Sequence, residues 1–356
     1  MFKFIHIADV HLGMHPDKDK VWSDDRAAEI EATFDTVLEH CATHEVNLLL
    51  IAGDLFDAPP TETELRKLDA RLKKATGTKV VIVTGSSDAA PADSIFFKYG
   101  FESDVTVLPP DVISQAYFEE LGVAVTGISY GREHYDEPML EHMTPAKEGA
   151  FNILLGYGGE KGYMPFSKDR LLEKGFDYIA LGRRHKPTVV AEHKMAFAGS
   201  LEPLSYKETG EHGYFFGKSD PEEGTEVSFV PVSLRKYVNL TVEVLPDMNN
   251  AAITAKVEEA IRESGSQNIF RILVKGYKNS DVTINLSEIL RRYQVLELRD
   301  KTGYSYDIEE LARENTGNLL GEIVTRLSDE ESLTREDIRE KAKRYAVLAL
   351  MDTGVS

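Results

Sequence analysis

The stretch "VNLLLIAGDLFD", Val46 to Asp57, joins an apolar run to two carboxylates. Its first part has the composition of a strand, and Asp54 and Asp57 follow directly where such a strand would end. Loops that leave the ends of strands often hold an active site. This stretch therefore predicts a strand with polar functional side chains at its carboxyl end.

The same arrangement recurs three more times along the first 190 residues or so. "FKFIHIADVHLG" places Asp9 and His11 after a strand, and "VVIVTGSSDAAPADS", Val80 to Ser94, places a Gly-Ser-Ser-Asp loop after another. "FDYIALGRRHKP" ends in Arg183, Arg184, His185 and Lys186. The four sites have a common design, which favours one shared site at one edge of the molecule.

Asp9 and His11 are two residues apart, so on an extended segment both side chains can face one ion. A carboxylate with an imidazole suits a divalent transition metal such as manganese, iron or zinc. Each motif alone is weak, because an aspartate at a strand end is usually a turn or cap residue and a lone histidine is usually structural. Four motifs in this order, each after an apolar strand, are much harder to obtain by chance.

Strand-like and helix-like segments alternate through the first half of the chain. Asp24 to Thr43 has helical periodicity, and Pro60 and Thr61 open a second helix. Closely spaced strands follow, "HKMAFAGS", "GYFFGK" and "EVSFVPVSL", which predict antiparallel pairing. This order predicts an α/β fold built as a sandwich of two mixed sheets flanked by helices, in preference to a simple doubly wound sheet.

A chain of 356 residues is long for one domain, and the pattern changes near Leu234. We expect a core at residues 1–234 and a small α+β domain of the split β-α-β type at 235–310. A helical tail at 311–356 would include a last helix from Thr334, with Ile338, Ala342, Tyr345 and Leu348 as a stripe packed on the protein itself.

The net charge is −19, and residues 1–230 carry −16 of it. Such a surface repels a polyanion at long range, so nucleic-acid binding would need a basic patch, a metal or a partner. The single cysteine, Cys41, excludes a disulfide framework and a cysteine zinc cluster, and it fits a reducing cytosol. The N-terminal segment does not resemble a signal peptide, and no apolar run reaches membrane-spanning length. We therefore expect a cytoplasmic protein without a membrane partner.

The motif order resembles the calcineurin-like metallophosphoesterases, and within them the SbcD-type and YhaO-type DNA repair exonucleases. That family has DxH, GDxxD, GNHD, a lone histidine after a strand, and then GHxH. "DVH" and "GDLFD" are intact here, and "AGSLEPLSYKETGEHGYFF" also resembles this branch. The resemblance extends over nearly the whole chain.

Four functional positions depart from the family pattern. GNHD is replaced by Gly-Ser86-Ser87-Asp88, the lone histidine aligns to Tyr157, and the first histidine of GHxH is Arg183. The resemblance assigns one metal to Asp9, His11, Asp54 and His185, all of which are present, with Asp57 behind them. The second metal would need Ser86, Tyr157 and Arg183 besides the shared Asp54. The resemblance thus implies one divalent ion, most simply manganese, and argues against a second.

The chemistry of the replacements points to reduced catalysis. Two-metal hydrolysis places one ion at the attacking oxygen and one at the departing oxygen. Arg183 stays protonated and has no lone pair for a metal, and the hydroxyl of Ser87 is too weak an acid to replace an imidazole near neutral pH. We expect a catalytic or phosphate-binding role for Ser87, Asp88, Arg183 and Arg184. We expect the guanidinium of Arg183 within salt-bridge reach of Asp54 or Asp57.

Three interpretations stay open at this point. The first is an SbcD/YhaO-like protein with impaired or lost nuclease activity and one metal, which works by binding or scaffolding. The second is an active one-metal phosphodiesterase or DNA exonuclease that uses Arg183 to stabilise a phosphate. The third is a structural site in which Asp54 and His185 pair with arginines and no metal binds. The family implies DNA and an SMC-like ABC ATPase as partners, and a homodimer through the helix at Asp24 to His44.

Overall fold

The computed structural model describes residues 2–220, 222–306, 308–328, 338, 342–343, 345–347 and 349–350. By the density of its internal contacts the chain divides into two units, Met1–Tyr237 and Val238–Ser356. The division falls close to Leu234, where the sequence pattern changes.

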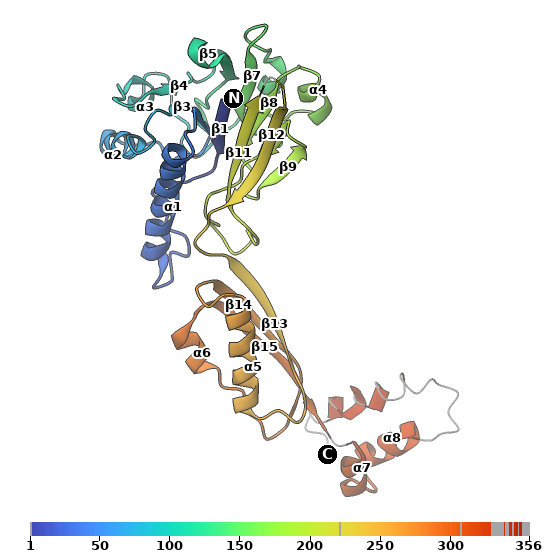
Figure 1. The fold of residues 1–356 in the computed structure, drawn as a ribbon. Helices are drawn as coiled ribbons and strands as arrows, with labels where there is room; N and C mark the ends of the chain where they lie inside the picture. Colours follow the sequence, from blue (N-terminus) through green and yellow to red (C-terminus); the bar gives the residue numbers. More distant parts are fainter. Residues whose placement is uncertain are drawn as a thin grey trace. The chain divides into compact units, whose positions relative to one another are not determined.

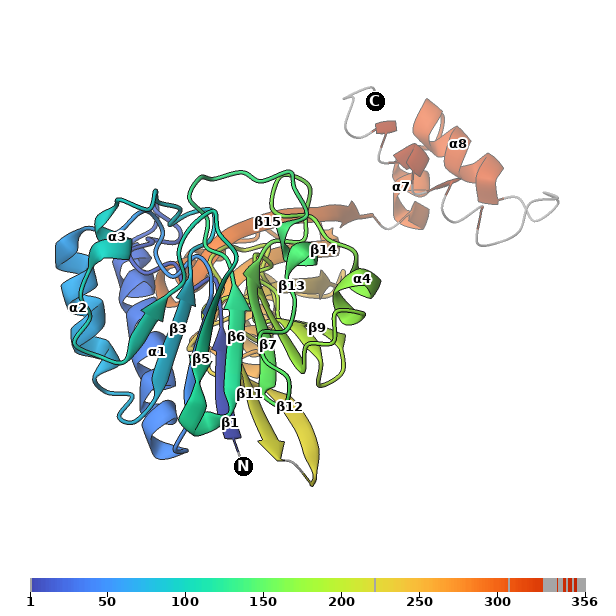
Figure 2. The same cartoon turned by 90° about the horizontal axis from the view of Figure 1, so that it is seen from above.

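The first unit contains two six-stranded sheets (Figures 1 and 2). The first sheet has the order β12 (Gly224–Pro231), β11 (Gly213–Asp220), β1 (Phe2–Ile7), β2 (Leu48–Ala52), β3 (Lys79–Val83) and β4 (Val105–Val107). The second has the order β5 (Ser114–Phe118), β6 (Val123–Gly127), β7 (Phe151–Tyr157), β8 (Tyr178–Gly182), β10 (Met195–Phe197) and β9 (Thr188–Ala191). Strands β1 to β4 are parallel to one another, as are β6, β7, β8 and β10, whereas β11, β12, β5 and β9 pair antiparallel. Both sheets are therefore mixed, and the predicted sandwich fold is confirmed.

Helices α1 (Ser23–Thr43) and α2 (Glu62–Leu72) lie along the outer side of the first sheet (Figure 2). The buried face of α1 includes Ile30, Phe34, Val37, Leu38 and Cys41, which are the residues that carry its helical periodicity. Helix α2 begins at a capping box between Thr61 and Glu64. The shorter helices are α3 (Ile95–Lys98), η1 (Glu119–Leu121), η2 (Met139–His142) and α4 (Lys168–Leu172).

The position of strand β2 between two packed layers explains why its sequence is apolar without interruption. Leu49 and Ile51 pack with α1 in one core cluster, whereas Leu48, Leu50 and Ala52 pack with the second sheet in another. A strand that is covered on both faces has no side chain left for water, so every position is apolar.

The second unit holds a three-stranded sheet in the order β13 (Tyr237–Val244), β14 (Ile269–Asn279), β15 (Gln294–Ser305). Helices α5 (Asn250–Glu263) and α6 (Ser287–Arg292) connect the strands, and Ile253, Val257 and Ile261 of α5 join the unit's core. The expected split β-α-β arrangement is wrong for these three strands, because neighbours in sequence are also neighbours in the sheet.

Two further helices follow, α7 (Ile308–Glu314) and α8 (Leu319–Ser328). The start predicted at Thr334, and Leu348 of the predicted stripe, lie outside the described residues. Ile338 is 50% exposed and Tyr345 is 70% exposed, whereas Val347 is buried with Leu320 and Val324. The predicted stripe is therefore wrong at Ile338 and Tyr345. Among the helices of the described part of the chain, none is long and apolar enough to cross a bilayer.

Candidate metal centre

Five strands bring the candidate residues together. Asp9, Asp54 and Gly85 follow the carboxyl ends of the parallel strands β1, β2 and β3, while Tyr157 ends β7 and Arg183 follows β8. The backbone amides of Asp9 and His11 donate to the carbonyls of Gly53 and Asp54 at 3.0 Å, which ties the first two loops to each other.

Gly182 lets the second sheet reach this edge. A side chain at Gly182 would place a Cβ atom 1.8 Å from the carbonyl oxygen of Ala52 in β2. With only hydrogen there, the backbone amide of Arg183 comes within 3.1 Å of an Asp9 carboxylate oxygen and donates to it. Close approach of the two sheets thus places the segment with His185 beside Asp9.

The backbone is strained where the predicted ligands lie. Asp9, His11 and Asp54 have positive φ angles of 49°, 52° and 47°, and Arg183 has a φ of 108°. Such conformations are uncommon for residues other than glycine and tend to occur at functional sites, where the surrounding structure holds them in place.

Asp9, His11 and His185 offer one ligand atom each, and these three atoms all lie within 4.8 Å of one another. The Nε2 atom of His11 is buried and has no hydrogen-bond partner in the described structure. A buried nitrogen without a partner indicates that something else binds it. Two imidazoles and a carboxylate together form a donor set that suits divalent transition metals. The residues present therefore fit a divalent ion.

A carboxylate orients each of the two histidines. The Nδ1 atom of His11 lies 3.1 Å from Asp57, and the Nδ1 atom of His185 lies 3.0 Å from Glu208. A carboxylate behind a ligating histidine fixes its tautomer and directs the Nε2 lone pair to the metal. Asp57 was predicted in this outer position from the sequence, and Glu208 was not.

The pKa values describe a cluster that attracts positive charge. Burial lowers the pKa of His185, but the hydrogen bond to Glu208 and the charge of Asp9 outweigh it and raise this pKa to about 9. The pKa of His11 is also raised, because its hydrogen bond to Asp57 and the charge of Asp54 outweigh burial. Burial raises the pKa of Asp9 to about 6. Both shifts show that the carboxylates favour a positive charge at this position, and a metal ion would compete with protons for the imidazoles.

Asp54 approaches this group without joining it. Its Oδ2 atom lies 3.7 Å from Nε2 of His11, but it also accepts a hydrogen bond from the hydroxyl of Tyr157 at 2.7 Å. Ser87 donates its backbone amide to Oδ1 at 2.8 Å and its hydroxyl to Oδ2 at 3.0 Å. Three of the four predicted ligands are therefore gathered, while the fourth is held by side chains from the replaced positions.

Tyr157 fills the space between the β2 and β3 loops. A Cβ atom at Gly53 would lie 2.3 Å from its ring, and one at Gly85 would lie 2.7 Å from it. The hydroxyl lies 2.9 Å from Ser86, and burial raises its pKa, so it remains a protonated donor to Asp54. The residues aligned with the second metal's ligands thus contact one another, and a tyrosine ring packs among them.

Asp88 lies beneath the loops of the site. It is fully buried, and its carboxylate accepts hydrogen bonds from the backbone amides of Gly85, Leu55 and Phe56 at 2.7, 2.9 and 3.2 Å. Burial and then the charge of Asp54 raise the pKa of Asp88 to about 7. The oxygens of Asp88 join the β2 and β3 loops to each other, and its catalytic or phosphate-binding role stays a prediction.

The partner expected for Arg183 is wrong. Its Nε atom lies 3.4 Å from Glu160, and within the described chain no ion pair joins it to Asp54 or Asp57. Arg184 faces the same carboxylate, with its Nε atom 3.9 Å from Glu160. Tyr157 stands between Arg183 and Asp54: Nη1 of Arg183 donates to its hydroxyl at 3.4 Å, and that hydroxyl donates to Asp54.

Pairing of Asp54 and His185 with arginines, the purely structural interpretation, is therefore not what the described residues form. His185 pairs with Glu208 and faces Asp9 at 3.9 Å, and Asp54 has Ser87 and Tyr157 as its neighbours.

The family pattern described as calcineurin-like phosphoesterase matches residues 2–204, more than half of the chain. The chain belongs to the calcineurin-like phosphoesterase family. The uncharacterized metallophosphoesterase YhaO of Bacillus subtilis (strain 168) is 26% identical over 300 residues, which cover 77% of this chain and 71% of YhaO. The SbcD component of the nuclease SbcCD of Escherichia coli (strain K12) is 26% identical over 312 residues, covering 72% of this chain and 74% of SbcD.

Membership of this calcineurin-like family agrees with the clustered ligands. The protein is a metallophosphoesterase by family, related to YhaO and to SbcD, and the family implies use of a divalent metal. Glu208, which sequence reasoning missed, belongs to the stretch "AGSLEPLSYKETGEHGYFF" that resembles this branch. That resemblance gave the region but not the role of the glutamate.

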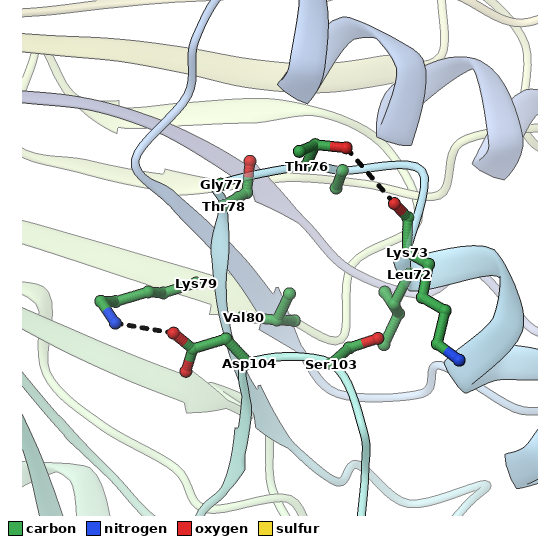
Figure 3. A pocket seen from close by; sticks show the side chains of 10 residues that line it. Leu72, Lys73, Thr76, Gly77, Thr78, Lys79, Val80, Ser103 and Asp104 are labelled. Atoms are coloured by element: carbon green, nitrogen blue, oxygen red, sulfur yellow. Dashed lines mark hydrogen bonds and ion pairs between the residues drawn. The ribbon is translucent and has the colours of Figure 1, made fainter.

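A hollow elsewhere on the first unit does not compete with this site. It lies at the amino end of β3 and is lined by Lys73, Lys79, Ser103 and Asp104 among others (Figure 3). Lys79 is already paired with Asp104 at 2.7 Å and with Glu120 at 2.9 Å. The predicted ligands lie at the opposite, carboxyl ends of the strands.

Proposed function

We propose that the protein is an SbcD/YhaO-like metallophosphoesterase homologue that keeps one metal half-site and has impaired or lost nuclease activity. One observation carries this proposal: Tyr157 packs against Gly53 and Gly85 and donates a hydrogen bond to Asp54, the carboxylate that two ions would share. A buried tyrosine that holds this carboxylate leaves neither the space nor the ligand for a second ion.

The remaining half-site would hold one divalent ion, with manganese as the first candidate and iron or zinc as others. Asp9, His11 and His185 would bind it through the atoms that lie within 4.8 Å of one another, with Asp54 as the fourth ligand if Tyr157 releases it. The ion would supply Lewis acidity toward a phosphoryl oxygen. Asp57 and Glu208 would keep both imidazoles oriented toward it.

The replaced loop residues support weak catalysis at best. A leaving group needs a proton from an acid whose pKa is near the working pH, and the hydroxyl of Ser87 does not meet that condition. Its hydroxyl hydrogen is directed at Asp54 in any case. We infer that Ser86 and Ser87 stabilise the closed arrangement of Asp54 and Tyr157 and take no part in proton transfer.

A second candidate function is an active one-metal phosphodiesterase or DNA exonuclease. The observation that favours it is Arg183, whose Nε atom is buried without a hydrogen-bond partner in the described structure. A guanidinium beside the ion could stabilise a phosphate as a second cation would, with Arg184 next to it.

We further propose the domain organisation and the partners that the family resemblance implies. Residues 235–310 would form a capping domain and 311–356 a helical tail. DNA and an SMC-like ABC ATPase would be the partners, and the relative from E. coli is by name one part of the nuclease SbcCD. The segment Asp24 to His44, most of which is helix α1, would form a homodimer contact. The buried free thiol of Cys41 supports a cytoplasmic location.

Restoring the missing residues tests the main proposal. The quadruple variant Ser86→Asn, Ser87→His, Tyr157→His and Arg183→His should hydrolyse bis-p-nitrophenyl phosphate with manganese at a rate well above the parent's. Single changes should do little, because residues that act as one unit are strongly non-additive.

The parent protein is the decisive control in this assay. Brisk manganese-dependent cleavage by the parent would favour the one-metal enzyme instead. A quadruple variant that folds like the parent and cleaves no faster would show that the second site is closed by more than these four residues.

A further inference from the structure

Two guanidinium groups converge on a single carboxylate beside the predicted metal centre. The Nε atom of Arg183 lies 3.4 Å from one Glu160 oxygen, and the Nε atom of Arg184 lies 3.9 Å from the other. We call Arg183 and Arg184 the arginine pair.

Aromatic rings hold both members of the arginine pair in position. The guanidinium carbon of Arg183 lies 3.7 Å from the centre of the Tyr163 ring, and that of Arg184 lies 4.6 Å from the centre of the Phe197 ring. Stacking of this kind orients a planar guanidinium and leaves the hydrogens at its edge available to an acceptor. The pair is therefore arranged before any ligand arrives.

Glu160 leaves part of the hydrogen-bonding capacity of the arginine pair unused. The Nε atom of Arg183 is buried and has no hydrogen-bond partner in the described structure, although a Glu160 oxygen is 3.4 Å away. A buried donor left in this state indicates an acceptor that binds there at another time. The side chain of Glu160 is 46% exposed, so it can turn into solvent without a backbone change, and breaking so exposed an ion pair costs little.

We propose that the arginine pair binds a terminal phosphate group, and that Glu160 is a built-in competitor that covers the pair in the free protein. Charge selects the ligand: two guanidiniums carry two positive charges, and Glu160 balances one of them. A phosphodiester also brings a single negative charge and gains no advantage over Glu160. A terminal phosphate brings about −1.5 to −2 at neutral pH and three acceptor oxygens, so it can displace the carboxylate.

The site lies next to the predicted metal ligands, since the backbone amide of Arg183 donates to Asp9 at 3.1 Å. Phosphate recognition here rests on the proposed function in one respect, namely that the protein's ligand is phosphorylated. The protein would then recognise a terminal phosphate group and would not bind a polymer through the phosphodiesters along its length.

Calorimetric titration with inorganic phosphate in the presence of EDTA tests this site without a metal. Glu160→Gln should bind phosphate about two- to fivefold more tightly than the parent, because the competing charge is gone while the side-chain volume stays. Arg184→Gln should bind at least about fivefold more weakly. Glu173→Gln removes a charge from another exposed position of the same unit and should bind like the parent.

Two further ligands define the chemical class. Dimethyl phosphate, a diester, should bind at least about fivefold more weakly than inorganic phosphate. A thymidine dinucleotide with a 5′-phosphate, compared with the same dinucleotide without it, distinguishes the two sources of a terminal phosphate. Tighter binding than inorganic phosphate would assign the site to nucleic-acid ends, and equal binding would assign it to free phosphate; both support the site.

The inference is wrong if Glu160→Gln binds phosphate no more tightly than the parent, or if the diester binds as well as inorganic phosphate. Manganese content, measured on the same proteins without EDTA, separates this failure from failure of the proposed function. If the parent binds manganese but Glu160→Gln leaves phosphate affinity unchanged, only the proposal of a phosphate site is refuted. If phosphate binds as expected but the parent takes up no manganese, only the proposal of a metal centre is refuted.

Discussion

His11 and His185 each give one ring nitrogen to a carboxylate and keep the other for the cluster around Asp9. Neither Asp57 nor Glu208 would touch an ion, yet both decide where the imidazole lone pairs point. Glu208 also accepts hydrogen bonds from the backbone amide of Leu204 at 2.8 Å and the hydroxyl of Ser205 at 3.1 Å, so its position is well determined.

Glu208→Gln should therefore weaken manganese binding by about tenfold, toward the lower end of the 10- to 100-fold range for such outer partners. The amide keeps the size of the side chain but removes the charge that holds His185. Isothermal titration with manganese gives the affinity, and thermal unfolding in EDTA shows whether the variant is folded. Glu173→Gln serves as the control, and unchanged affinity in Glu208→Gln would remove that residue from the metal centre.

At the scale of strands, the close approach of β8 to β2 sets the geometry of the centre. A Cβ atom at Gly182 would meet the carbonyl oxygen of Ala52 at 1.8 Å and the Cβ atom of Ala8 at 2.9 Å. Both neighbours belong to packed strand ends, so the strands themselves would have to separate. The segment from Arg183 to His185 would move with β8.

Gly182→Ala should accordingly lower the free energy of unfolding by about 1–3 kcal/mol and weaken manganese binding as well. Gly100→Ala is the matched control, because a Cβ atom there meets nothing within 4 Å. Urea unfolding of both variants supplies the comparison. If Gly182→Ala proves as stable as Gly100→Ala, the two sheets are not held as closely as described.

Strands β2 and β3 could be predicted from sequence because they are buried on both faces and consist almost entirely of apolar residues, and β1 could be predicted although Lys3 and His6 interrupt its apolar residues. Strands β4, β5 and β9 escaped prediction, since they lie at sheet edges, where the apolar pattern is weak. In β5 and β9, for example, Gln115, Tyr117 and Val189 are exposed. Asp9 and His11 could be placed together from their spacing after one strand, whereas His185, which follows β8 of the second sheet, could be grouped with them only through the family resemblance.

Residues from irregular segments could not be placed in this way. Glu160 and Glu208 reach the site through tertiary contacts that no local pattern encodes. The expectation that Arg183 would pair with Asp54 was wrong for a related reason: the sequence did not reveal that Tyr157 donates to Asp54 and stands between the two. The sequence likewise placed Asp88 in a loop, but it did not reveal that the side chain is fully buried and joins two loops.

For the whole molecule, the two units have separate cores. Three buried clusters lie within Met1–Tyr237, and Ile253, Phe270 and Ile272 belong to a cluster within the second unit. Every predicted metal ligand belongs to the first unit. A ligand stabilises only the unit that binds it, by about 2.7 kcal/mol at a hundredfold excess over its dissociation constant.

Differential scanning calorimetry should thus resolve two transitions, of which only one shifts upward when manganese is added. The shifting transition should belong to the first unit, and Glu208→Gln should reduce its shift. A single transition that moves as a whole would mean that the two units unfold together and that their cores are not independent.

The number of manganese ions per chain tests the central claim most directly. Equilibrium dialysis against manganese followed by elemental analysis should give one ion in the parent, bound at Asp9, His11 and His185, because Tyr157 holds Asp54 and fills the neighbouring space. The quadruple variant with asparagine and histidines at the replaced positions should give two. Two ions in the parent would contradict the closed second site, and none would contradict the metal centre itself.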